Sequence, residues 1–405
     1  MPHGGRGGGG GGGLYVTRIK IDMDSVRRAA ERGDVEAMYR LGVAYADGAG
    51  VPQDFQQSRH WLERAGEAGN VQAMLLLATG VQCGYYGLPD VNVAMMWYRR
   101  AADMGDPHAM VAVGQAYWNG YEDLRPDAAE AVRWFRRAAE KGQPEGARLL
   151  ASVLLQGVPG VPADVAEGFR WALAGAEKGD FTAMCLAAKC YKDGVGTAKD
   201  DGKAFHWCKK ATESDPSKQE FRNLNFGAAA TGPGTVGAVH PAHAAARVMT
   251  GAPALEALEA LEMLGECYHK GIGTAVNLKE AVRCYKKAAE GGNAAAYRQL
   301  ATMLHQGLGL APDARKALSY LQKAAQLGDH EAMRILGDLL KSGDGVPRDV
   351  DAGMRWLRKS AELGNRLAMV QLGMACERGW GVAPDVGEAA RWYRRAAEAG
   401  EAIAA

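Results

Sequence analysis

The side chains that could do chemistry are scattered along this 405-residue chain. It has no phosphate-binding glycine loop followed by lysine, no G-x-S-x-G, no H-E-x-x-H and no pair of C-x-x-C motifs. His240 and His243 have a spacing that some metal ligands share, yet no cysteine or carboxylate lies near them to complete a site. We therefore expect no catalytic site, no bound metal and no cofactor.

Composition implies no particular class of partner. The 48 basic and 47 acidic side chains nearly cancel, so no long-range field implies nucleic acid or an anionic membrane. No window offers the roughly 18 apolar residues that a membrane helix needs, and the N-terminal residues lack a signal-peptide apolar stretch. Seven cysteines, an odd number, are typical of free thiols. We expect no membrane insertion and a cytoplasmic location, with organelle import as an alternative because of Arg6, Arg18 and Lys20.

A regular repeat organises the chain. Glycines that mostly precede Asp or Asn recur 36 or 37 residues apart in two runs, at positions 33, 69, 105, 142 and 179 and then at positions 292, 328, 364 and 400. A fixed period of this length is the signature of repeat architectures, in which stacked units share a continuous core.

Each repeat unit reads as two helices joined by a glycine turn. Ala37 to Tyr45 and Phe55 to Ala65 carry apolar residues at three- and four-residue steps, and Gly48 and Gly50 break the chain between them. The second helix opens at Asp54, a capping residue. We call the set of equivalent positions in successive repeats a column. The column of Asp54 contains Asp90, Asp127, Asp164, Asp200, Asn277, Asp313, Asp349 and Asp385. Glutamates three residues later, at 130, 167 and 388, predict capping boxes.

Two columns predict the packing. The column of Gly42 contains only Gly or Ala, which indicates the place where the two helices of a pair touch. Seven of the nine tryptophans share a second column, and we expect each to fill the seam between neighbouring units. They are Trp61, Trp97, Trp134, Trp171, Trp207, Trp356 and Trp392.

These motifs resemble the Sel-one-like repeat family, a branch of the tetratricopeptide-like helical repeats. The residues that carry the resemblance are the A-M-x-x-L-G-x-x-Y run at Ala37 to Tyr45, the G-x-G-V turn at Gly48 to Val51, Asp54, and W-x-x-x-A at Trp61 to Ala65. The resemblance implies an all-α, right-handed α-solenoid of about nine antiparallel helix pairs. A cysteine-rich branch of this family links the two helices of a repeat, but the regular pairs are absent here, so buried free thiols are the preferred interpretation.

The repeats predict a domain organisation. We expect a flexible glycine-rich tail at 1–21, a capping half-repeat at 22–33, five repeats at 34–215 and four at 256–401. Residues 216–255 interrupt the pattern and form either a loop or an eroded repeat.

Two surface features suggest contacts with partners. Basic doublets recur on the second helices, and acidic neighbours such as Glu140 favour a salt-bridged, solvated face over nucleic-acid binding. Aromatic residues gather at the turns, at Tyr85, Tyr86, Trp118, Tyr121 and Trp380, and either anchor a partner or brace the glycine turns.

The sequence therefore predicts a non-enzymatic adaptor or scaffold that binds one or more proteins or peptides on its repeats. An activating or regulatory subunit of an enzyme complex is the alternative, and a hydrolase like those proposed for the cysteine-rich branch is a weaker one.

Overall fold

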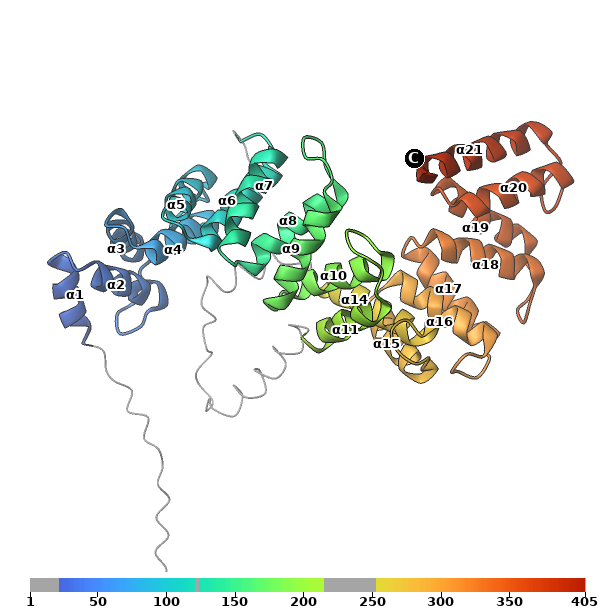
Figure 1. The fold of residues 1–405 in the computed structure, drawn as a ribbon, viewed down its shortest axis with the longest axis horizontal. Coiled ribbons are helices and arrows are strands. Elements are labelled where there is room, and N and C mark those ends of the chain that lie inside the picture. The colour runs from blue at the N-terminus through green and yellow to red at the C-terminus, as the bar shows by residue number, and fades with distance from the viewer. Residues whose placement is uncertain (1–21, 121–123, 215–252, 405) are drawn as a thin grey trace, which may run out of the picture. The chain divides into compact units, whose positions relative to one another are not determined.

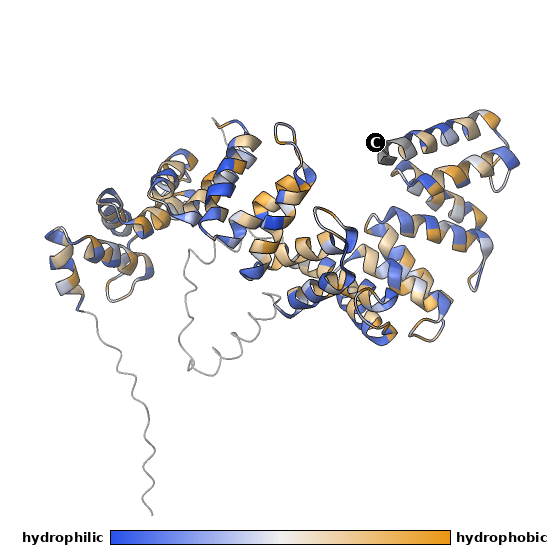
Figure 2. Cartoon of the chain, viewed as in Figure 1, coloured by the Kyte–Doolittle hydropathy of each residue, from blue (hydrophilic) through white to orange (hydrophobic). Residues whose placement is uncertain are grey.

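The computed structural model describes residues 22–120, 124–214 and 253–404, with side chains between 257 and 400 in the last segment. The chain forms two compact units, and in the described residues the first ends at Ala109 and the second begins at Met110. Both consist of helices whose hydrophobic and hydrophilic residues lie side by side along each helix, as expected for amphipathic helices (Figure 2).

The first unit contains a stack of consecutive helices (Figure 1). They are α1 (Met23–Glu31), α2 (Val35–Asp47), α3 (Phe55–Glu67), α4 (Val71–Gln82) and α5 (Val91–Asp103). From α1 to α5, each helix packs on the next along the chain. Helix α6 (Pro107–Asn119) spans the boundary between the units.

The second unit contains the same kind of repeat, in which a turn joins a first helix to a second helix. It contains α7 (Ala128–Glu140), α8 (Pro144–Gln156), α9 (Val165–Glu177), α10 (Phe181–Asp193), α11 (Asp201–Glu213), α14 (Pro253–Lys270), α15 (Leu278–Glu290), α16 (Ala294–Gln306), α17 (Ala314–Gln326), α18 (His330–Ser342), α19 (Val350–Glu362), α20 (Arg366–Arg378) and α21 (Val386–Ala404). The largest contacts join the two helices of a repeat, such as α18 and α19.

Side-chain caps start the second helices, as the sequence predicts. Asp54 Oδ1 accepts hydrogen bonds from the amides of Gln56 and Gln57 at 2.9 and 3.0 Å. In the described residues, the equivalent Asp or Asn also caps each of the remaining second helices. These bonds satisfy amides that a helix start leaves without partners.

The predicted capping boxes are wrong. The Asp54 amide donates to the carbonyl of Tyr45 at 2.9 Å, and the equivalent amide of Asp164 donates to Leu154. Because the preceding helix already satisfies this amide, no glutamate is needed for it. Glu167 instead contacts Arg136 and Trp171.

Glycines end the helices in backbone conformations that other residues avoid. Gly48 ends α2 with φ of 68°, and Gly33 follows α1 with φ of 96°. Gly400 departs from this pattern, because it lies inside α21, which continues to Ala404.

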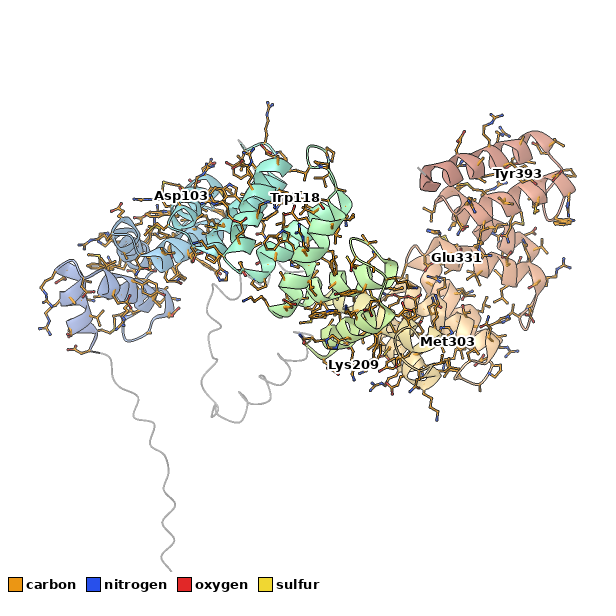
Figure 3. The ribbon with its side chains drawn as sticks, in the orientation of Figure 1. Asp103, Trp118, Lys209, Met303, Glu331 and Tyr393 are labelled. Atoms are coloured by element: carbon orange, nitrogen blue, oxygen red, sulfur yellow. The ribbon has the colours of Figure 1, made fainter. Side chains whose placement is uncertain are left out.

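The column of Gly42 sets the distance between the helices of a pair. A Cβ on Gly42 would lie 2.7 Å from Leu62 Cγ, and one on Gly373 would lie 2.6 Å from the ring of Tyr393, which Figure 3 labels on α21. Only small residues fit where the second helix approaches this closely.

Most of the tryptophan column is buried. Five of its seven rings are at most 8% exposed, namely Trp61, Trp97, Trp134, Trp207 and Trp392. A Cβ on Gly66 of the preceding repeat would lie 3.0 Å from the Trp97 ring, so Trp97 fills the seam between repeats. Trp171 and Trp356 are only half-buried, a departure from the expectation that every ring fills its seam. They pack against clusters that join the preceding repeat to the first helix of their own repeat.

The repeats on either side of residues 215–252 belong to one core. Helix α14 begins at Pro253, inside the range assigned to the interruption, and packs on α11 and α10. A single apolar cluster contains Trp207 of α11 together with Leu264 of α14. The remainder of the predicted interruption lies outside the described residues.

Candidate interaction groove

The first helices of the last three repeats line an open groove of about 1060 Å³ in the second unit. Its apolar surface includes Leu321, Ile335, Leu339 and Met374. These residues come from α16 to α20 and the turns that follow their first helices, so the 36-residue period sets the spacing of the groove walls.

A hydrogen-bonded network crosses the groove around Asp338 of α18. Its Oδ2 accepts from Arg334 Nη1 at 2.9 Å and from Gln371 Nε2 at 3.1 Å, and its Oδ1 lies 3.3 Å from Lys341 Nζ. Gln371 belongs to α20, so the network fixes two neighbouring repeats to each other. The polar wall is therefore held in place before any partner arrives.

A second carboxylate extends this network along α18, where Figure 3 labels Glu331. Glu331 Oε2 accepts from Asn365 Nδ2 at 2.8 Å and also bonds Arg334. Burial raises the pKa of Glu331, but the hydrogen bonds from Arg334 and Asn365 outweigh it and leave that pKa below its ordinary value. Glu331 is therefore an anion that orients Arg334.

A contact between a histidine and a carboxylate lies at the turn side of the groove. His305 Nε2 of α16 is 3.3 Å from Asp344 Oδ2, which follows α18. Their side chains are 43% and 69% exposed, so both are open to a ligand.

Exposed apolar side chains complete the groove. Trp380, in the turn after α20, is 57% exposed, and Met374 on α20 is 39% exposed. The Arg378 guanidinium lies 4.7 Å from the Trp380 ring centroid, which holds one face of the indole. An exposed aromatic ring next to a groove is a typical anchor point in interfaces.

The other turn aromatics differ from one another. Tyr86 is 8% exposed and packs against Gly80, which favours the alternative that it braces the turn over the alternative that it anchors a partner. Tyr85 is half-buried and stacks on Phe55, with ring centroids 5.9 Å apart. Trp118 on α6 is 39% exposed (Figure 3). Tyr121 lies outside the described residues.

The basic doublets have structural partners. Arg136 pairs with Glu167 of the next repeat rather than with Glu140 of its own helix, and Arg358 pairs with Glu388 in the same way. The second member of a doublet covers the tryptophan of its own helix, as Arg137 covers Trp134 at 4.2 Å from the ring centroid. Most doublet charges that the structure describes are thus engaged within the repeats.

In the segments that the structure describes, no three His, Cys, Asp or Glu side chains are grouped so that they could hold a metal ion. Nor does any helix of those segments have the length and apolar character needed to span a membrane.

Sequence reasoning missed most of the groove. Of its residues, the sequence singled out only Trp380 as a candidate contact. The repeat pattern could have found more of the groove. It places Ile335 and Met374 on first helices and Asp344 in a turn, and these are the parts of each repeat that line the groove.

This architecture defines an all-α protein built from tandem antiparallel helix pairs. The Sel1 repeat profile matches it at 35–70, 71–106, 107–143, 144–180, 182–216, 258–293, 294–329, 330–365 and 366–401. The chain therefore belongs to the Sel1 repeat family, and the resemblance and the helical-repeat fold predicted from the sequence are confirmed. Sel1 repeat proteins typically mediate protein–protein interactions and are generally non-catalytic.

Solved structures give the same fold. A protective antigen of uropathogenic Escherichia coli strains with an SLR fold is 30% identical, with a TM-score of 0.56 over 94% of this chain and 82% of that one. A Sel1 repeat protein from Oxalobacter formigenes is 22% identical, with a TM-score of 0.54 over 87% of this chain and 90% of that one.

A curated relative matches only a short piece. The DAP3-binding cell death enhancer 1 of Rattus norvegicus is 52% identical over 40 residues, which is 10% of this chain and 8% of that protein.

Proposed function

We propose that this chain is an adaptor or scaffold that binds a partner protein or peptide in the groove of its last three repeats. The observation that carries the proposal is the groove itself, where exposed Trp380 and Met374 stand beside the apolar surface of Ile335. A partner side chain buried there would gain apolar contact, while the Asp338 network offers fixed polar groups. We place the protein in the cytoplasm and assign it no catalytic activity.

Affinity capture with matched variants tests this proposal. The groove variant carries Met374→Lys and Trp380→Ala, and the control carries Leu327→Lys and Leu363→Ala, which are 53% and 57% exposed outside the groove. Because all four side chains are exposed, both variants should keep the helicity of the unchanged chain. We expect a stoichiometric partner to be retained by the unchanged chain and the control, and to bind the groove variant at least about tenfold more weakly.

Equal retention by the two variants would contradict the groove as the binding site. If the captured partner is an enzyme, its rate with and without the chain distinguishes a scaffold, which leaves the rate unchanged, from the regulatory subunit that is the alternative role.

A further inference from the structure

Two buried cysteines from different repeats contact each other at the junction of α11 and α14. The thiol groups of Cys208 and Cys267 are joined by a side-chain hydrogen bond. Their exposed fractions are 1% and 0%, and both belong to the core cluster that unites these helices. Cys208 lies in the same repeat as Cys190, whereas the cysteine that it contacts belongs to the next repeat.

The surroundings distinguish the two sulfur atoms. The shared hydrogen bond and burial raise the pKa of the Cys208 thiol. The same hydrogen bond lowers the pKa of Cys267, and the positive charge of Lys192 lowers it further. Cys267 is therefore the better nucleophile of the pair, while Cys208 keeps its proton.

The connection between the helices makes this position sensitive to a cross-link. Helix α11 ends at Glu213 and α14 begins at Pro253, so no short turn joins them. Their packing depends on the cluster that contains the two thiols. A covalent bond between residues 208 and 267 would close a long loop of the unfolded chain and stabilise the junction.

We propose that Cys208 and Cys267 form an inter-repeat disulfide by exchange with a small-molecule disulfide such as glutathione disulfide. The Cys267 thiolate attacks one glutathione sulfur, which releases one glutathione thiolate and leaves a mixed disulfide on Cys267. Cys208 then gives its proton to the solvent, and its thiolate attacks the Cys267 sulfur, which releases the second glutathione as a thiolate that takes up a proton. Two protein thiols are oxidised and one glutathione disulfide is reduced to two thiols. Since both sulfurs are buried, the exchange requires transient separation of α11 and α14.

The test uses the full chain with the exposed Cys83 replaced by serine. The protein is incubated with glutathione disulfide under native conditions, and the remaining thiols are blocked. Peptide mass spectrometry without reduction then maps every cross-link. We expect a linked pair of peptides containing Cys208 and Cys267 that dithiothreitol separates, and a higher melting temperature for the oxidised protein.

Matched variants connect the bond to these residues. Cys208→Ala and Cys267→Ala should each abolish the cross-link, while Cys190→Ala and Cys284→Ala, also in the buried cluster, should retain it. A bond from Cys208 to Cys190, mixed disulfides without a cross-link, or complete resistance to oxidation would each overturn the proposal. If a variant with a buried substitution does not fold, the cross-link map of the Cys83→Ser chain still shows whether Cys208 and Cys267 form the disulfide.

Discussion

The Arg136 guanidinium of α7 binds both carboxylate oxygens of Glu167 in α9, one repeat further along the chain. Glu167 also accepts a hydrogen bond from Trp171 Nε1 at 3.1 Å. Arg358, Glu388 and Trp392 repeat this arrangement near the C-terminal end. The basic doublets and the glutamates after the caps therefore connect successive repeats.

Replacement of Glu167 by glutamine should weaken this connection in a pH-dependent way. The hydrogen bond from Arg136 holds the pKa of Glu167 below its ordinary value, despite burial. A carboxyl group with a lowered folded-state pKa contributes stability above its unfolded-state pKa and loses it as the pH falls through the folded-state pKa. We expect Glu167→Gln to cost about 1 kcal/mol of unfolding free energy at pH 7, a value limited by the exposure of Arg136.

Urea titrations at several pH values measure this effect. The difference between the unchanged chain and Glu167→Gln should shrink from about pH 5 downward, as the pH falls through the lowered folded-state pKa of Glu167. Glu362→Gln, at an exposed position of α19, serves as the control and should show little difference at any pH. A Glu167→Gln cost that stayed constant with pH would show that the charge of Glu167 is not what stabilises the fold.

Truncation of Trp97 should destabilise the fold far more than truncation of Trp380. Trp97 is 4% exposed and packs against Gly66 in the neighbouring repeat, whereas Trp380 is 57% exposed. We expect Trp97→Ala to cost about 3–5 kcal/mol, and Trp380→Ala to cost at most about 0.5 kcal/mol. Denaturant unfolding followed by circular dichroism compares them, and similar costs would refute the assignment of this column to the seam.

Gly337→Ala should destabilise the chain although alanine favours helices. The added Cβ would lie 2.9 Å from the carbonyl oxygen of Gly353 in α19, a backbone atom that cannot rotate away. The usual gain of about 1 kcal/mol from glycine to alanine in a helix should be reversed to a loss of about 1–3 kcal/mol. Gly202→Ala is the control, because its nearest neighbour is an Asp200 oxygen at 3.4 Å. A stabilised Gly337→Ala protein would contradict the close approach of α18 and α19.

The fold could be predicted from the sequence because each repeat contains the same residues at the helix starts, the helix ends and the packing positions. Asp54 and its equivalents start helices, Gly48 ends one, and the Gly42 column requires close packing, so nine imperfect copies reinforce one interpretation. The capping boxes failed because a local motif does not reveal that a carbonyl from the preceding helix satisfies the same amide.

The candidate site was less predictable because it depends on neighbours from several repeats. Tyr86 and Trp380 both follow the first helix of a repeat, yet Tyr86 packs over Gly80 and Trp380 remains exposed. Position along one helix does not determine which side chain the next repeat places over it. The contact between Cys208 and Cys267 has the same origin, because column alignment compares equivalent positions and does not describe packing across repeats.

Site-specific photo-crosslinking tests the groove most directly. A photoreactive phenylalanine analogue is placed at Trp380 in one chain and at Leu327, an exposed residue outside the groove, in another. After irradiation with the captured partner, we predict an efficient cross-link from position 380 that excess unlabelled chain suppresses, and little from position 327. Equal yields at the two positions, or a cross-link from 327 alone, would contradict a binding site in the groove of the last three repeats.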